Sequence, residues 1–473
     1  MEKNWDYLNE PMVGIIAPAG YGKTEEIAEA VRVCDGKQLI LTHTRAGVAA
    51  LRERMKRKKI CSEKYEIDTI ASFCLKWCKA YPSTAGIQIP EKIGDINYQE
   101  IYRGAGKVFS YCWAKSVLKQ TYTGLFVDEY QDCTESQHDI FMGLNNLIPI
   151  RIFGDPLQGI FYWVNGDKIV DWKSFSFKII TPLTIPWRWE NTNKELGELL
   201  DSLRKKIIVA LDGKPVTINI ADIPGCMTIL NANQWDNGRY AYGIKNYNSL
   251  VYLSAIPNKH KYFSQHNGGF FQCDETKDMA EVEDIIATIE SKEKERKALI
   301  FLEMMKQMIN GIQAELGSYI NNLNKGKSDF VRITKHKELG RILKKICNDD
   351  SPQPVLEALR WFGRSKTFKI YRKEFFYRIG KTYAHMVEEK TSLHEAVEFL
   401  SSQSYFSEKK FAFPRLSSRT VLTKGLEFDC VIIDARDKMD VRDFYVAMTR
   451  AKKHIYIISN SRQLSFNGVQ YQK

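Results

Sequence analysis

The sequence has little that would take the protein out of the cytosol. Met1–Asn9 is polar, and the short apolar run Met12–Ala17 leads into glycines, unlike the hydrophobic segment of a secretion signal. No stretch approaches the ~18 consecutive apolar residues that a membrane-spanning helix requires. We therefore expect a cytoplasmic protein without a membrane partner.

Patterns typical of metal centres and nucleases are also missing. The ten cysteines include no C-x-x-C pair, so the spacing of a zinc ribbon or a thioredoxin motif is absent. Cys74 and Cys78 lie one helical turn apart and could hold a metal, but reduced core thiols are the expected state in the cytosol. We find no cluster of acids and lysine typical of a nuclease outside the residues discussed below, so DNA cleavage would require another polypeptide.

The sequence does contain enough material for several packed domains. Its 473 residues are 44% hydrophobic and 27% charged, a composition typical of a globular protein. A usual domain size of about 150 residues suggests roughly three units. The 69 lysines and arginines exceed the 57 acids and leave a net charge of +12, which favours a polyanionic partner.

Short apolar runs alternate with helical patterns through the first 180 residues and again near the end. This alternation predicts parallel sheets with covering helices, and functional groups at the carboxyl ends of the strands. The stretches 279–345 and 351–402 are largely helical and charged, which suits an inserted accessory domain. The strand candidates are Val13–Ala17, Gln38–Thr42, Leu125–Asp128, Ile150–Phe153, Cys430–Asp434 and His454–Ile458, the last two flanking a helix at Val441–Arg450.

A phosphate-binding loop is predicted at A-P-A-G-Y-G-K-T, residues 17–24, between a strand and a helix. Backbone N–H groups freed by the glycines and by the helix start would cradle phosphates. Lys23 would reach the β and γ oxygens of ATP, and Thr24 would ligate Mg²⁺. The alternative is a glycine-rich turn with a chance lysine, but the order of strand, loop and helix favours the phosphate loop.

A second motif, L-F-V-D-E-Y-Q-D at residues 125–132, runs from a hydrophobic strand into adjacent carboxylates. Asp128 at the strand tip is placed to hold Mg²⁺, and Glu129 can polarise an attacking water. Two adjacent acids at a strand end are common by chance. Together with the phosphate loop, however, they predict an ATP-hydrolysing site.

Further motifs resemble, in the same order, those of the UvrD/Rep-type superfamily 1 DNA helicases. The matching segments are L-T-H-T-R-A-G from Leu41, T-I-A-S-F from Thr69, G-D-P-L-Q-G-I-F-Y-W from Gly154, W-R-W from Trp187, K-G-L-E-F from Lys424 and Y-V-A-M-T-R-A from Tyr445. The resemblance implies an α/β fold with two RecA-like P-loop NTPase motor domains and helical accessory insertions.

The resemblance also assigns roles around ATP. Gln158 would sense the γ-phosphate or its water, and Arg188 and Arg450 would neutralise charge during transfer as arginine fingers. Ordinary surface pairing is the alternative for both arginines and for Glu427. Glu427 would accept a hydrogen bond from the ribose, and Trp187 would stack on the base. The implied nucleotide-binding residues are Ala19, Gly20, Tyr21, Gly22, Lys23, Thr24, Trp187, Gly425 and Glu427, with Thr24 and Asp128 as metal ligands.

Contacts to single-stranded DNA are implied by the same resemblance at His43, Thr44, Phe73 and Trp163, by base stacking and backbone contacts. For Phe73 and Trp163, a plain core role is the alternative. The basic run 52–59 is more typical of a solvated helix face than of a phosphate contact. The stretch 361–383 interleaves basic and aromatic residues and could form an accessory DNA surface.

The predicted domain organisation follows the motifs. A first motor domain is expected at 1–183, with a small inserted subdomain at about 75–120. The second motor domain is expected to start at 184–275 and to resume at 411–473. A mainly helical accessory insertion would occupy 276–410.

The sequence departs from the family pattern at several positions. Residues 1–20 lack the glutamine that reads the adenine edge, so a preference for ATP over GTP does not follow. Ala17 replaces the first glycine of the phosphate loop, and Ala71 replaces the histidine of T-x-H-S-F. Val421 stands near the place of the histidine before K-G-L-E-F, and His43 where phenylalanine is common.

Two functions fit these observations. The first is an ATP-driven helicase or translocase that moves 3′→5′ on single-stranded DNA. The second is a DNA-sensing ATPase subunit that switches a partner nuclease with little unwinding. Small members of this helicase family that carry a T-H-T-R-A segment, as this chain does at residues 42–46, resemble the helicase subunit of Gabija-type antiphage systems. That resemblance implies an OLD-family nuclease as partner in a defence complex. Single-stranded or tailed DNA is the expected ligand, although neither stacking nor phosphate contacts inspect the 2′-OH of RNA.

Overall fold

A computed structural model describes residues 5–90, 96–160, 168–219, 224–231, 233, 235, 241–256, 258–274, 279–406, 413–436 and 439–469. They form two compact units: unit 1 is Met1–Tyr247 with Thr423–Lys473, and unit 2 is Asn248–Leu422. Unit 1 therefore joins the N-terminal α/β region to the last two strand candidates. The domain boundaries expected from the sequence stay a prediction.

The first sheet, in unit 1, contains six strands in the order β3-β2-β4-β5-β1-β6, and all of its neighbouring strands are parallel. The strands are β1 (Met12–Ile16), β2 (Gln38–Thr42), β3 (Tyr65–Thr69), β4 (Gly124–Val127), β5 (Ile150–Gly154) and β6 (Lys178–Ile180). Apolar and β-branched residues fill β1, β2, β4 and β5, as a sheet covered on both faces requires. The four strands predicted in this region are confirmed.

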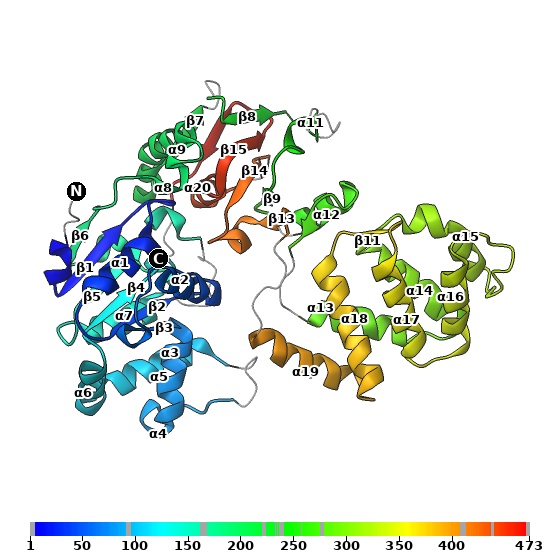
Figure 1. The fold of residues 1–473 in the computed structure, drawn as a ribbon, viewed down its shortest axis with the longest axis horizontal. Coiled ribbons are helices and arrows are strands. Elements are labelled where there is room, and N and C mark those ends of the chain that lie inside the picture. The colour runs from blue at the N-terminus through cyan, green and yellow to red at the C-terminus, as the bar shows by residue number, and fades with distance from the viewer. Residues whose placement is uncertain are drawn as a thin grey trace. The chain divides into compact units, whose positions relative to one another are not determined.

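Alternate residues of these strands enter two separate cores. Val13 and Ile15 point to one face with Phe126, where α1 (Lys23–Val33) and α2 (Arg45–Arg57) pack. Leu39 and Leu41 point to the other face. That face is covered by α3 (Ile70–Ala80), α5 (Tyr98–Ser110), α6 (Cys112–Thr121) and α7 (Glu135–Leu144), as Figure 1 shows. The two-residue period of a strand produces this division.

The second sheet has one parallel part in each unit. In unit 1, β15 pairs in parallel with β14 and with β8; in unit 2, β13 pairs in parallel with β9 and with β10. These strands are β8 (Met227–Leu230), β9 (Leu250–Ser254), β10 (Gln272–Cys273), β13 (Arg415–Arg419), β14 (Phe428–Asp434) and β15 (Ala451–Ile458). With α20 (Val441–Thr449) between β14 and β15, the predicted α/β fold with two RecA-like sheets is confirmed.

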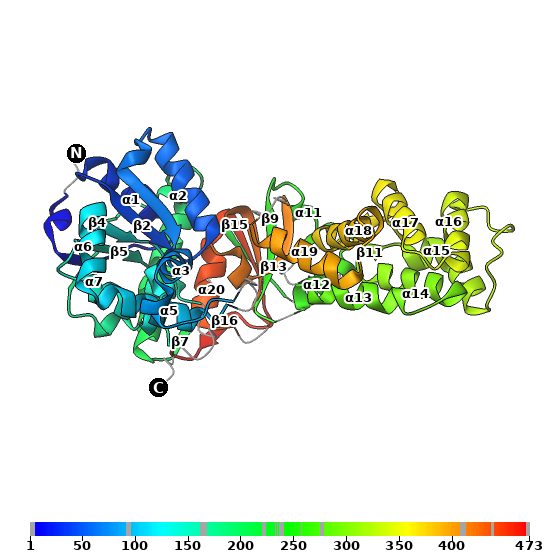
Figure 2. The ribbon, with the colours of Figure 1, turned by 90° about the horizontal axis from the view of Figure 1, so that it is seen from below.

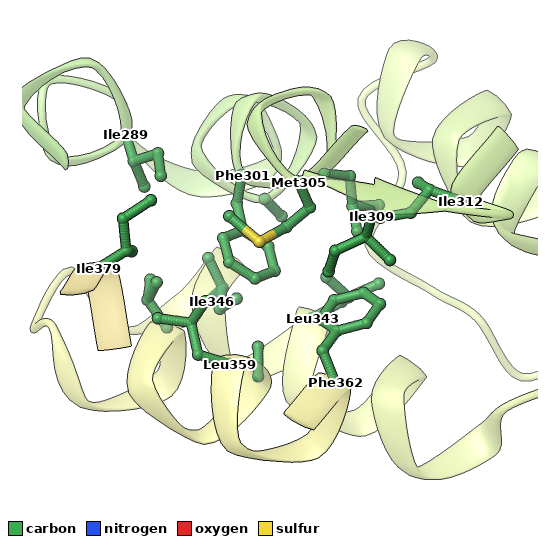
Figure 3. Close-up of a cluster of buried hydrophobic side chains, with 14 of the residues drawn as sticks. Ile289, Phe301, Met305, Ile309, Ile312, Leu343, Ile346, Leu359, Phe362 and Ile379 are labelled. Carbon is green, nitrogen blue, oxygen red and sulfur yellow. The ribbon is translucent and has the colours of Figure 1, made fainter. Parts of the chain in front are cut away.

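Unit 2 also contains the predicted helical region (Figures 1 and 2). Its helices are α13 (Ala280–Glu290), α14 (Lys294–Lys306), α15 (Ile312–Asn324), α16 (Lys337–Asn348), α17 (Gln353–Arg364), α18 (Lys373–Glu388) and α19 (Leu393–Phe406). They share one apolar core, which includes Phe301, Met305, Leu343 and Phe362 (Figure 3).

Smaller elements complete the two units. They are α4 (Pro82–Ala85), α8 (Trp187–Glu190), α9 (Lys194–Ile207), α11 (Ala241–Ile244), α12 (Lys259–His266), the antiparallel pair β7 (Val216–Asn219) and β16 (Gln463–Phe466), and the antiparallel pair β11 (Ile309–Asn310) and β12 (Lys369–Ile370). Short 3₁₀ turns include η4 (Tyr130–Asp132) and η5 (Pro156–Gln158). Within the described ranges, no helix has the length and apolar character needed to cross a membrane.

Candidate ATP-hydrolysis site

The predicted phosphate loop lies between β1 and α1, at the carboxyl end of β1. Gly20 and Gly22 have φ angles of +76° and +85°, a left-handed conformation that favours glycine. A Cβ on Gly20 would lie 2.8 Å from the Cβ of Arg188, and one on Gly22 would lie 3.2 Å from Cδ1 of Trp187. The loop can therefore present backbone N–H groups at the start of α1 only with small residues at these positions.

Lys23 is the first residue of α1, and its side chain is 8% exposed. Its ammonium donates to the carbonyl of Ala17 at 2.9 Å and to that of Pro18 at 3.4 Å. Burial lowers the pKa of Lys23, while the carboxylates of Glu129, Asp155 and Asp128 oppose this change. The cation is thus held under the loop beside several acids, with no carboxylate as a direct hydrogen-bond partner in the bonds described.

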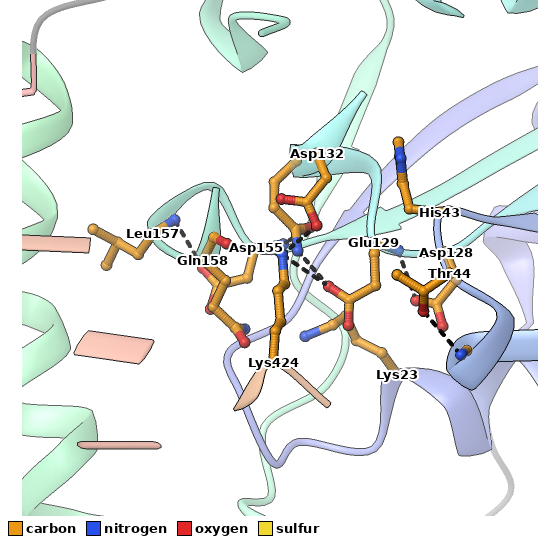
Figure 4. Close-up of polar contacts among 12 residues, drawn as sticks. Lys23, His43, Thr44, Asp128, Glu129, Asp132, Asp155, Leu157, Gln158 and Lys424 are labelled. Carbon is orange, nitrogen blue, oxygen red and sulfur yellow. Dashed lines mark hydrogen bonds and ion pairs between the residues drawn. The ribbon is translucent and has the colours of Figure 1, made fainter. Parts of the chain in front are cut away.

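Asp128 and Glu129 follow β4, as predicted. Asp128 is 4% exposed, and one of its oxygens accepts from the backbone N–H of Glu129 at 2.9 Å. Glu129 has a φ of +56°, which is uncommon outside glycine and is a conformation often retained at functional sites. The side chain of Gln131 donates to the carboxylate of Glu129. The turn therefore places the two neighbouring carboxylates of Asp128 and Glu129 close to Lys23 (Figure 4).

The two carboxylates have opposite electrostatic environments. Burial and the charge of Glu129 raise the pKa of Asp128. Burial also acts on Glu129, but Lys424 and Lys23 outweigh it and hold the pKa of Glu129 below its usual value. A divalent cation beside Asp128 would relieve the repulsion between the two acids, and oxygen ligands of this kind are those that Mg²⁺ prefers. The residues present therefore fit a magnesium-nucleotide complex.

Gln158 comes from η5, which follows β5. The side chain is 3% exposed, and its Nε2 donates to Asp155 at 2.8 Å. Its Oε1 accepts from Nη2 of Arg450 at 3.2 Å. Both ends of the amide are thus engaged, which fixes its orientation.

Arg450 lies at the end of α20 and is 2% exposed. Besides Gln158, its guanidinium donates to Thr449 Oγ1 at 3.0 Å and to the carbonyl of Val446 at 3.0 Å. The structure therefore brings Arg450 to the Gln158 side chain, although the two residues are far apart in the sequence.

Arg188, in α8, pairs with Glu427. Its Nε and Nη2 donate to the same oxygen of Glu427 at 3.0 and 2.7 Å, and Nη1 donates to the carbonyl of Thr449. The side chain of Glu427 is 44% exposed, so solvent weakens this ion pair. The two residues thus pair with each other in this structure, and the bond to Thr449 places Arg188 next to the helix that carries Arg450. Their roles toward ATP stay predictions.

The other predicted nucleotide-binding residues differ in exposure. Trp187 is 57% exposed and can stack on a ligand, whereas Ala19 is buried and Thr24 is partly buried. Tyr21 is buried, and its hydroxyl donates to Asp201 of α9 at 3.0 Å, so its side chain points toward α9. Gly425 is exposed, with a φ of +82°.

The residues predicted to contact DNA fall into three groups. Thr44 is exposed and caps α2 by accepting from the N–H of Gly47 at 3.0 Å, while His43 is partly buried with Nε2 3.3 Å from Sγ of Cys133. Phe73 is 4% exposed and packs against the ring of Phe109 at 5.9 Å, which favours the core role. Trp163 lies outside the described residues. These DNA contacts stay predictions.

The other two basic segments also show mainly structural contacts. In the run 52–59, Lys58 pairs with Glu25 and Glu29 of α1. In the stretch 361–383, most aromatic side chains belong to the core of unit 2, including Phe362 and Tyr383, whereas Tyr377 is 46% exposed. Core packing therefore accounts for most of this aromatic pattern.

Sequence reasoning missed four polar residues of the site, of which Gln131, Asp132 and Arg204 are buried and Lys424 is partly buried. Lys424 pairs with Asp132 and donates to the carbonyl of Gln158 at 2.9 Å. The side chain of Gln131 links Glu129 to Asp155. Its amide nitrogen donates to the Glu129 carboxylate, and its amide oxygen accepts from the backbone N–H of Asp155 at 2.9 Å. Lys424, Gln131 and Asp132 lie inside the quoted motifs, so their position was the available signal. Arg204 lies in no motif.

Two family models match the chain. An AAA domain matches residues 3–162, which contain Lys23, Asp128, Glu129 and Gln158. A UvrD-like helicase C-terminal domain matches residues 422–458, which contain Glu427 and Arg450. The two matches thus cover both sequence regions that meet at the site.

Comparison with individual proteins gives shorter or weaker likenesses. "Gabija protein GajB" from Bacillus cereus (strain VD045) is 34% identical over 83 residues, which is 14% of this chain and 17% of that protein. The match therefore spans about a sixth of the relative's length. The solved complex of Arterivirus nonstructural protein 10 (helicase) with DNA aligns with 96% of this chain and 62% of that one, at 9% identity and a TM-score of 0.35.

The order of the motifs, the two parallel sheets and the two family matches agree with one another. They support a helicase-type ATPase. In its motifs and in these two matches, the chain resembles the UvrD-like superfamily 1 helicases.

Proposed function

We propose that this protein is an ATP-driven motor that moves 3′→5′ along single-stranded DNA and separates short duplexes. The observation that carries the proposal is the meeting of Gln158 from the first sheet with Arg450 from α20, at 3.2 Å, beside the acids of β4. A site built from both sequence regions can couple hydrolysis to motion, because its completion depends on how they approach each other.

Each residue of the site has a proposed task. Lys23 binds the β and γ oxygens of ATP, and the backbone of the glycine loop binds the remaining phosphate oxygens. Glu129, whose pKa is held low, stays ionised and polarises the attacking water. Bound Mg²⁺, ligated by Thr24 and Asp128, would supply neutralisation of phosphate charge.

The remaining residues act on the reacting phosphate and the nucleoside. Gln158 orients the water or the γ-phosphate, and Arg188 and Arg450 stabilise the charge that develops on it. On ATP binding, the ion pair between Glu427 and Arg188 would be replaced by a bond from Glu427 to the ribose and one from Arg188 to the phosphate. Trp187 stacks on the base.

DNA is the proposed polyanion because of the net charge of +12 and the UvrD-like match. The test is strand displacement from a duplex with a 3′ single-stranded tail, with a 5′-tailed duplex as the matched control. We expect ATP-dependent product from the 3′-tailed substrate alone. Equal product from both, or product without ATP, would contradict the directional motor.

A second function is favoured by the local match to Gabija protein GajB. In this alternative, the protein senses DNA, hydrolyses ATP and regulates a partner nuclease in antiviral defence. Absence of strand displacement, together with a stable complex on co-purification with a nuclease encoded beside it, would favour this alternative. Robust displacement by the purified protein alone would favour the motor.

A further inference from the structure

Arg204 is a buried cation that belongs to none of the quoted motifs. It lies on α9, is 7% exposed, and its Nη1 donates to Oδ1 of Asp155 at 2.6 Å and to the hydroxyl of Tyr445 at 3.3 Å. Its guanidinium carbon lies 5.6 Å from the centre of the Tyr445 ring. A buried ion pair adds little net stability, because desolvation of both ions offsets their attraction. Its presence at this position therefore calls for another reason.

Asp155, the partner of Arg204, uses its two oxygens for different purposes. Oδ1 accepts from Arg204 and from the N–H of Leu157 at 3.3 Å, whereas Oδ2 accepts from Nε2 of Gln158 at 2.8 Å. The carboxylate is fully buried. Arg204 therefore fixes the group that in turn holds the Gln158 amide.

The bonds form a chain that runs Arg204, Asp155, Gln158 and Arg450. Its two ends come from α9 and α20, the second of which also carries Tyr445. Its middle comes from the loop after β5. A shift of α9 or α20 against the first sheet would consequently change the orientation of the Gln158 amide.

We propose that Arg204 is a positioning residue that acts through Asp155 to orient Gln158 toward the reacting phosphate. This role rests on the proposed function, because it requires ATP turnover at the site. Without Arg204, Asp155 would be a buried carboxylate with one charged partner fewer, and it would rotate or take up a proton. Either change removes the acceptor that fixes Nε2 of Gln158.

The test is a mutant cycle of Arg204→Gln, Gln158→Ala and the double variant, measured as kcat and KM for ATP with and without single-stranded DNA. For Arg204→Gln we expect a loss of about 10–100-fold in DNA-stimulated kcat, with KM within about threefold, because misplacement of a catalytic group acts on the chemical step. The double variant should match Gln158→Ala, since the two residues act through one side chain.

Arg442→Gln is the matched control, because Arg442 is also a buried arginine, 6% exposed, and bonds to Asp440 at the start of α20. It should leave kcat unchanged even where it lowers the melting temperature. If Arg204→Gln does not fold, Arg204→Gln/Asp155→Asn removes the uncompensated charge, and it should fold and show the same loss in kcat.

Losses that multiply in the Arg204/Gln158 double variant would overturn this role, as would a wild-type kcat in Arg204→Gln or in its charge-neutral form. A wild-type protein without ATP turnover would instead overturn the proposed function and this role with it. The two failures are thus distinguishable.

Discussion

The ATP site of unit 1 and the helical part of unit 2 bury different kinds of side chain. Around the site, charged residues such as Lys23, Asp128 and Arg450 are less than a tenth exposed. The helical core is instead almost wholly aliphatic and aromatic, as in Figure 3. Buried charges there are few among the described residues, and Lys297 satisfies its ammonium with Glu290 and the carbonyl of Asp350.

The helical core of unit 2 and the ATP site of unit 1 contribute to different properties, stability and function. Apolar burial stabilises a fold by about 25 cal/mol per Å², whereas buried charges are costly unless they are paired. The helical region therefore obtains its stability from packing. The site retains buried charges that do not contribute to packing. Substitutions in the helical core should therefore lower stability and leave ATP turnover unchanged, whereas substitutions in the site should lower turnover and leave stability unchanged.

The largest expected effect on stability is in the helical core. Phe301 is fully buried there, so Phe301→Ala should lower the free energy of unfolding by about 3–5 kcal/mol through lost burial and a cavity. ATP turnover per folded molecule should stay unchanged. Chemical denaturation and a steady-state ATPase assay measure the two quantities.

Val331→Ala is the control for that substitution, because Val331 is 82% exposed. It should change neither quantity. A Phe301→Ala protein as stable as the wild type would show that the helical core does not carry the stability assigned to it.

The opposite pattern is expected for Lys23→Met. Loss of the phosphate contact should lower ATP turnover by at least ~100-fold. The free energy of unfolding should stay the same or rise by about 1 kcal/mol, because the variant no longer buries a charge whose pKa burial has lowered. A clear loss of stability together with retained turnover would contradict the division between the two regions.

A smaller effect concerns pH. Burial and the charge of Lys424 lower the pKa of His43 to about 3. The unfolded chain, with a histidine pKa near 6.5, binds more protons below that pH, so folding stability from this residue is complete above pH ~6.5 and falls at lower pH. Between pH 7 and 5, wild type should lose about 2 kcal/mol more than His43→Gln.

Thermal or urea unfolding at the two pH values checks this difference. Asp132, whose pKa burial raises to about 7, acts in the opposite direction, but it is present in both proteins and cancels. Identical pH dependence in wild type and variant would mean that His43 protonates freely in the folded protein.

Local patterns were sufficient to predict much of the fold. The apolar runs that became β1, β2, β4, β5, β14 and β15 are short and bounded by turns, and the glycines at 20 and 22 mark a left-handed loop before Lys23. These features depend on residues near one another in the sequence. For the same reason, the helical region between the two parts of the second sheet could be predicted.

Contacts between distant segments could not be predicted in this way. Arg204 and Asp155 belong to different elements, and nothing near Arg204 in the sequence marks it as a partner for a buried carboxylate. Phe73 lies within the T-I-A-S-F motif, for which a DNA contact was predicted, yet its ring joins the core with Phe109, because its side of α3 faces α5. The direction of a side chain depends on packing partners that a motif does not specify.

The most direct test of the account is steady-state ATP hydrolysis with and without single-stranded DNA, for wild type and Glu129→Gln. Glu129 is the proposed water-polarising carboxylate, so the variant should fold normally and lose about 10²–10⁴-fold in turnover. We predict strong stimulation of the wild type by DNA and none in the variant. A hydrolysis rate that DNA does not change, or one that Glu129→Gln retains, would contradict a nucleic-acid-coupled motor at this site.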